Sequence, residues 1–107
     1  MTDQKKTRRQ TLEEFLAKEP NDAFCRYGLA LDCMNSGDSA AAETHFRQLL
    51  ERHADYVPAY LMYAQLLVRE SRTDEAKQVL NTGITVASQK GNAHAKSEME
   101  SLFSELA

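Results

Sequence analysis

The sequence predicts an all-α protein built from repeated helical hairpins, and three observations support this fold class. First, the 107 residues include only 4 glycines and 2 prolines, too few turn-forming residues to separate many short strands. Second, the chain aligns with itself at an offset of 34 residues. Third, apolar residues near the C-terminus recur at helical spacing. A chain of this length is expected to form one domain.

The offset of 34 places large residues over large ones and small residues over small ones. The paired residues are Leu29 and Tyr63, Ala30 and Ala64, Ala42 and Ala76, Phe46 and Leu80, and Leu50 and Ile84. Two helices of a hairpin pack closely only where one side chain is short enough to admit a large one from the other helix. The alanines are therefore expected at the contacts within each hairpin.

This pattern resembles the tetratricopeptide repeat (TPR) family, whose unit is a helix–turn–helix of 34 residues. The resemblance implies a right-handed solenoid of helical hairpins, an α-α superhelix. Two departures stand out. Arg26 occupies a position where an aromatic residue is usual, and Ala54 and Ser88 occupy positions where a proline commonly ends the repeat.

The chain is expected to have four parts: a disordered basic tail over 1–10, a short helix over 11–19, two TPR-like repeats over 20–90, and a capping helix over 91–107. The short helix would stand in for the second half of a preceding unit and cover the edge of the first repeat. The tail is expected to be solvated, with a basic anchor for nucleic acid or acidic lipid as the alternative. Ser39 and Thr73 are the expected N-caps of the second helix in each repeat.

The capping helix is indicated by a single apolar stripe with polar residues between its members. The stripe consists of Ala95, Met99, Leu102, Phe103 and Leu106. A solenoid's last repeat exposes a hydrophobic flank, and a terminal helix with one polar face closes it.

Composition excludes several classes of function. The net charge of −3 is too mild for a general nucleic-acid or membrane surface. No apolar stretch reaches about 18 residues and the N-terminus lacks a signal-peptide core, so we expect a cytoplasmic protein. Cys25 and Cys33 are expected to be small buried residues without a disulfide, since eight helical residues separate their Cα atoms by about 12 Å.

No catalytic chemistry is predicted. The sequence has no phosphate-binding loop, nucleophile elbow or HExxH motif. The histidines His45, His53 and His94 are scattered, and we expect them on the solvent side without a metal. We therefore expect no enzyme, no cofactor, no metal and no small-molecule substrate.

The resemblance implies that the first helix of each repeat lines a concave groove that binds a peptide or helix of another protein. By register, the groove positions are Phe24, Tyr27, Leu31 and Met34 in the first repeat and Pro58, Leu61, Met62, Gln65 and Arg69 in the second. The helix from Asp22 to Asn35 is apolar nearly all round, so something must cover it.

Three occupants of the predicted groove stay open: a segment of another protein, a second copy of the chain forming a homodimer, and the chain's own tail or first helix. The first is the leading hypothesis, because contiguous exposed apolar surface usually marks a binding site. Nucleic-acid binding is disfavoured, because the groove lacks polar base-reading residues and dense basic side chains.

Overall fold

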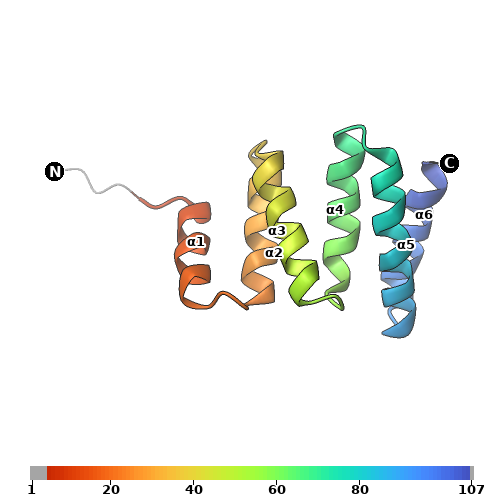
Figure 1. Cartoon of the computed structure of the whole chain (residues 1–107), viewed down its shortest axis with the longest axis horizontal. Helices are drawn as coiled ribbons and strands as arrows, with labels where there is room; N and C mark the ends of the chain where they lie inside the picture. Colours follow the sequence, from red (N-terminus) through yellow and green to blue (C-terminus); the bar gives the residue numbers. More distant parts are fainter. Residues whose placement is uncertain (1–4, 107) are drawn as a thin grey trace. The chain divides into compact units, whose positions relative to one another are not determined.

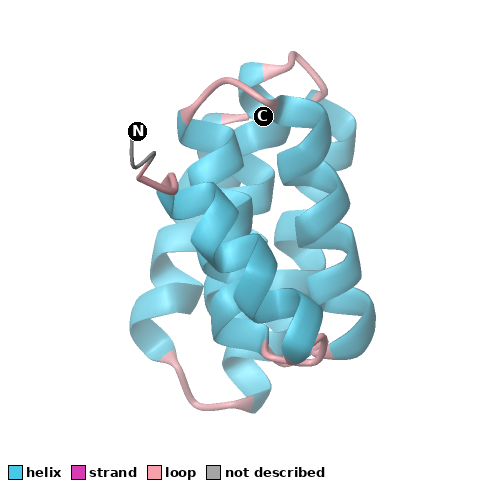
Figure 2. Ribbon diagram, turned by 90° about the vertical axis from the view of Figure 1, so that its left-hand side faces the viewer, coloured by secondary structure: helices cyan, strands magenta, loops and turns pink. Residues whose placement is uncertain are grey.

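The computed structural model describes residues 5–106, which form α-helices joined by short loops and contain no strand (Figures 1 and 2). The helices are α1 (Arg8–Lys18), α2 (Ala23–Asn35), α3 (Ser39–Arg52), α4 (Val57–Arg69), α5 (Thr73–Gln89) and α6 (Ala93–Glu105). The chain divides into two compact units, Met1–Leu49 and Leu50–Ala107. The all-α repeat prediction is confirmed within each unit.

The repeat is visible in the helix boundaries, because α4 begins and ends one period of 34 after α2. The four predicted close-packing alanines, Ala30, Ala42, Ala64 and Ala76, are fully buried. The turns match as well: Gly37 and Ser71 lie one period apart, and both have positive φ, 86° and 60°. A left-handed residue directly after a helix lets the chain turn sharply into the next one.

The contacts of Arg26 explain how it replaces the aromatic residue that is usual at its position in the family. Its side chain is buried, donates from Nη2 to the carbonyl of Pro20 at 2.9 Å, and also donates to Gln48. One period later, the hydroxyl of Tyr60 donates to the carbonyl of Ala54, again six residues upstream. The guanidinium of Arg26 thus forms a hydrogen bond to the preceding loop that is equivalent to the bond formed by the Tyr60 hydroxyl in the second repeat.

The first unit contains α1, α2 and most of α3. Helix α1 packs on α2, and the Cys25 thiol donates to the carbonyl of Leu12 at 3.4 Å. Leu16 is the residue of α1 that is buried, whereas Phe15, expected to cover the edge with it, is 49 % exposed. The short helix therefore covers the edge of the first repeat only in part.

The N-terminal boundary corrects the predicted tail. Helix α1 begins at Arg8, so residues 8–10 are helical rather than part of a disordered tail. The reason is a capping box: Thr7 Oγ1 accepts from the Gln10 backbone at 3.1 Å, and Gln10 Oε1 accepts from the Thr7 backbone at 2.9 Å. Of the rest of the predicted tail, residues 5–7 precede α1 without secondary structure, and residues 1–4 lie outside the described residues.

The predicted N-caps are also corrected. Asp38, not Ser39, caps α3, since its Oδ1 accepts from the backbone of Ala41 at 3.1 Å. Helix α5 starts at Thr73 after Arg72, which makes no side-chain capping bond. Asp74 and Glu75 supply negative charge in the first turn of α5, where it stabilises the positive end of the helix dipole.

In the second unit, α4, α5 and α6 lie side by side, each pair in contact (Figure 1). The closest approach is at Gly83 in α5, where an added Cβ would lie 2.5 Å from Tyr60 Cβ and 2.6 Å from Met99 Sδ. Met99 of the predicted stripe is fully buried, while the other four members are half-buried. The C-terminal helix thus packs its apolar stripe toward α5.

Candidate functional site

The residues predicted to bind a partner in the first repeat differ widely in exposure. Phe24 is 76 % exposed, and Tyr27 and Leu31 are half-buried. Met34 is buried, with 4 % exposed, and this corrects its place among the surface positions. Its side chain therefore belongs to the core and not to a binding surface.

A hollow of about 390 Å³ lies between α1 and α2 within the first unit. Its apolar wall consists of Leu12 and Phe15 from α1 and Phe24, Tyr27 and Leu31 from α2. Phe15 and Phe24 are the exposed large hydrophobic residues of the described chain, and both line this one hollow. An exposed pair of aromatic rings around a concave apolar surface is typical of a binding site.

The shape of the hollow depends on Gly28, which faces it from α2. A Cβ at Gly28 would meet the methyl groups of Leu12 at 3.8 and 3.9 Å, an ordinary contact distance. Asp22 stands at one end, held by the hydrogen bond that its Oδ1 accepts from the Cys25 backbone at 2.7 Å. Arg8 lines the hollow from the first turn of α1.

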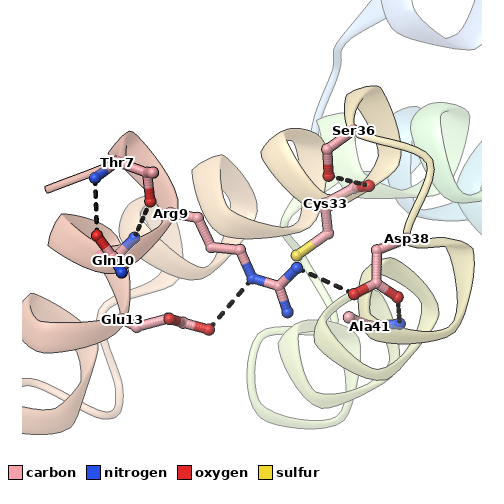
Figure 3. A network of polar contacts seen from close by, with 8 residues as sticks. All are labelled: Thr7, Arg9, Gln10, Glu13, Cys33, Ser36, Asp38 and Ala41. Atoms are coloured by element: carbon pink, nitrogen blue, oxygen red, sulfur yellow. Dashed lines mark hydrogen bonds and ion pairs between the residues drawn. The ribbon is translucent and has the colours of Figure 1, made fainter.

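Two other basic residues near Arg8, Arg9 and Lys6, form ion pairs, and Figure 3 shows those of Arg9. Arg9 Nη1 lies 2.9 Å from Asp38 Oδ2, and its Nε lies 3.3 Å from Glu13 Oε2. Lys6 pairs with Glu14 at 2.6 Å. The Arg9 hydrogen bond, with that from the Ala41 backbone, lowers the pKa of Asp38. Within residues 5–106, no carboxylate pairs with Arg8.

The second-repeat positions lie in the other unit and have a different character. Leu61 and Gln65 of α4 line a hollow of about 360 Å³ with the polar face of α6. That face carries His94, Ser97, Glu98, Ser101 and Glu105 beside Leu102. Pro58 and Arg69 are exposed and Met62 is half-buried, but none of the three lines this hollow.

Sequence reasoning did not select Arg8, Leu12 and Phe15 as binding residues. The short helix was identified as the second half of a preceding unit, but its residues were expected to cover an edge. The useful signal was the match of this helix to the second helix of a repeat, whose inner face packs against the first helix of its own hairpin. Within residues 5–106, no helix precedes α1 to form that hairpin.

The histidines and cysteines do not form a metal site. No group of three His, Cys, Asp or Glu side chains in residues 5–106 is placed to hold a metal. Cys25 and Cys33 are free and buried, as predicted, and burial raises the pKa of both thiols. His45 corrects the expectation of a solvent-side residue: it is half-buried and its Nδ1 has no hydrogen-bond partner in the described structure.

Burial is also the main cause that lowers the pKa of His45, with the positive charge of Arg26 second. His94 is exposed and lies 3.3 Å from Glu98 Oε1. Within residues 5–106, no helix has the length and apolar character needed to cross a bilayer.

The helical hairpins, their 34-residue period and the buried small residues define a helical repeat protein. The sequence profile described as "Tetratricopeptide repeat" matches residues 34–96, more than half of the chain. The chain therefore belongs to the tetratricopeptide repeat family. A TPR repeat-containing protein of Pseudomonas aeruginosa is 26% identical over 88 residues, which cover 82% of this chain and 84% of that protein.

Solved structures give the same assignment. A solution NMR structure of a tetratricopeptide repeat domain protein from Salinibacter ruber is 32% identical, with a TM-score of 0.78, covering 81% of this chain and 88% of that one. A crystal structure of a tetratricopeptide repeat domain protein from the same organism is 32% identical, with a TM-score of 0.75 and coverage of 79% and 96%. A protein from Bordetella parapertussis, 20% identical, shares the fold, with a TM-score of 0.82 and coverage of 95% and 89%.

Membership of the family carries a general functional meaning. Tetratricopeptide repeat domains generally mediate protein–protein interactions and are generally non-catalytic scaffolds. The physical basis is that stacked hairpins present extended surfaces on which side chains from successive helices converge.

Proposed function

We propose that this chain is a non-catalytic protein-binding module that holds a peptide or helix of another protein against the apolar hollow of its first unit. The observation that carries the proposal is the convergence of Phe15 and Phe24 on one concave surface, although each stands on a different helix. Burying such rings on binding is favourable by about 1.5–3 kcal/mol for each side chain. Tyr27 and Leu31 extend the same apolar wall.

The second-repeat positions belong to the same proposal in a lesser role. Leu61 is the apolar residue that α4 contributes to the hollow of the second unit, and the rest of that lining is mostly polar. We therefore assign the main binding energy to the first unit. Pro58, Met62, Gln65 and Arg69 would contact only a ligand that also reaches the second unit. A cytoplasmic location fits the two free cysteines, which persist in reducing compartments.

Selection from a library of random peptides on the intact chain tests the proposal. Each enriched peptide is then titrated by fluorescence anisotropy against the unaltered chain, Phe24→Glu and Thr44→Glu. Thr44 is exposed on α3, outside the hollow, so this control adds the same charge elsewhere. We expect Phe24→Glu to weaken binding by about 10-fold or more, and Thr44→Glu to leave it unchanged.

Peptides that bind both variants as well as the unaltered chain would refute this assignment of the site. A solution mass that doubles with concentration, and that Phe24→Glu returns to the monomer, would show that a second copy occupies the hollow instead. Phe24 is well suited to the test, because an exposed side chain can be replaced without disturbing the core.

A further inference from the structure

The second unit shows what normally packs against a helix pair like α1 and α2. Helix α6 repeats the residue range of α4 after 36 residues, and α4 repeats that of α2 after 34. On this register, Phe24, Tyr27 and Leu31 of α2 correspond to His94, Ser97 and Ser101 of α6. Those three residues line the second hollow, opposite Leu61 and Gln65 of α4. The face of α2 that lines the first hollow therefore corresponds to the face of α6 that lines the hollow beside α4, where these three residues remain exposed.

Helix α1 fits the same comparison, because it corresponds to residues of α3 and α5 at successive offsets of 34. Phe15 corresponds to Leu49 and Gly83, and both of these are buried. Arg8 corresponds to Ala42 and Ala76, which have no exposed surface. Positions that are enclosed in α3 and α5 are thus open in α1. Within residues 5–106, the pair α1–α2 resembles the pair α5–α6 without α4.

We propose that the hollow between α1 and α2 binds an amphipathic helix of another protein, in the place that α4 takes on α5 and α6, with a carboxylate of that helix opposite Arg8. This inference rests on the proposed function and names the class of partner. The partner helix would run antiparallel to α1, as α4 does to α5 within its hairpin. About three to four turns would match the length of α2 and α4.

The side chains of α1 set the chemistry of the partner helix. In the second unit, Tyr60 of α4 fits because it packs against Gly83, which has no side chain. In α1 that position is Phe15, so the partner needs a small residue where α4 has Tyr60. In the hairpin of α4 and α5, Ala64 and Ala76 are the small residues at the close crossing.

Arg8 replaces the second of these alanines in α1. Its guanidinium lies on the hollow and pairs with no carboxylate of residues 5–106. An acidic residue at the register of Ala64 therefore complements it, whereas an alanine there would leave the charge uncompensated.

A second copy of the chain is a poorer donor of such a helix. Each helix already buries side chains within its own chain, and α4 and α6 would expose Tyr60 and Met99 if they were withdrawn to fill the hollow of another copy. The outer face of α6 carries serines and glutamates rather than large apolar residues. Binding a helix of another protein does not expose buried residues of this chain.

The probe is a synthetic, fluorescein-labelled peptide with the 13-residue α4 sequence carrying Tyr60→Ala and Ala64→Glu. A matched peptide carries Ala64→Lys instead, and a third adds Met62→Pro to the acidic peptide to prevent helix formation. Anisotropy is measured with the intact chain, with Phe24→Glu and with Arg8→Glu. Far-UV circular dichroism checks that both variants keep their helicity.

We expect the acidic peptide to bind more tightly than the lysine peptide, and Arg8→Glu to reverse this order, with changes of about 3-fold in each direction. Phe24→Glu and the proline peptide should each lose about 10-fold or more. An order of binding that Arg8→Glu does not reverse would overturn the carboxylate assignment, and a proline peptide that binds equally well would overturn the helix.

The failure of this inference differs from the failure of the proposed function. If library peptides require Phe24 but the α4-derived peptide does not bind, the proposed protein-binding function is supported and the proposal of a helical partner is refuted. If neither class of peptide responds to Phe24→Glu, both are wrong. A dimer that excludes the probe and dissociates in Phe24→Glu would assign the hollow to a second copy and overturn the foreign helix.

Discussion

The contact at Gly83 gives the sharpest test of how the second unit is packed. Replacing Gly83 with alanine would place a Cβ 2.5 Å from Tyr60 Cβ and 2.6 Å from Met99 Sδ. Carbon atoms in contact prefer about 3.5–4.0 Å, so α4 must move away from α5 by about 1 Å. Both neighbours are buried, and the Tyr60 Cβ is fixed to the backbone of α4, so this contact is relieved only by moving the helix.

The magnitude follows from two opposing effects. Overpacking a core position costs about 1–3 kcal/mol, and two buried neighbours on different helices place this site near the upper end. Alanine in place of glycine in a helix interior contributes about 1 kcal/mol in the other direction. We therefore expect Gly83→Ala to lower the free energy of unfolding by about 2 kcal/mol, which lowers the Tm by roughly 10 °C in a chain of this size.

Gly28→Ala is the matched control, because the same propensity gain applies but the nearest atoms lie at ordinary contact distances. We expect this variant to be more stable than the unaltered chain, by up to about 1 kcal/mol. Urea unfolding followed by far-UV circular dichroism measures both. A Gly83→Ala protein that unfolds at the same or a higher urea concentration would show that the helices do not approach as closely as the structure indicates.

Two further predictions concern buried polar groups. Arg26→Leu removes the hydrogen bonds to Pro20 and Gln48 and should lower the free energy of unfolding by about 2 kcal/mol. Arg26→Tyr can form the bond to Pro20 again, as Tyr60 does with Ala54, and should lower it by less than about 1 kcal/mol. Equal urea midpoints for the two variants would contradict this. For His45, burial lowers the folded-state pKa below the ordinary 6.5, so the unfolded chain takes up the proton first as the pH falls. Stability should therefore drop from about pH 7.5 to about pH 5.5, and His45→Gln, which cannot be protonated, should lose less over the same range.

The architecture was predictable because its determinants are local or periodic. Each signal relates a residue to others on the same helix or on a neighbouring one. These signals are the offset of 34, the small residues Ala30 and Ala64, and the apolar stripe around Met99. Helix pairing follows from such patterns, since short turns leave consecutive helices little choice of neighbour. The same reasoning placed both cysteines in the core as free thiols.

Helix boundaries were less predictable, because side chains of adjacent residues compete for the same backbone groups. Ser39 and Asp38 are both suitable N-caps, and the carboxylate of Asp38 also pairs with Arg9 of α1. A contact with a helix 29 residues away cannot be inferred from the turn alone. Thr7 and Gln10 form a capping box, but they lie within a run of basic residues that favours a solvated tail.

The sequence by itself determined the class of protein, the order of the helices and the faces that they bury, because these depend on helical periodicity and on the size of residues at fixed spacing. The tertiary structure decided which apolar residues remain uncovered. Phe24 and Met34 both lie on the apolar helix α2, yet one is open and the other enclosed. Periodicity identifies an apolar face, but only the neighbouring helices decide how much of it water reaches, and at α1 and α2 the described chain offers no helix to cover it.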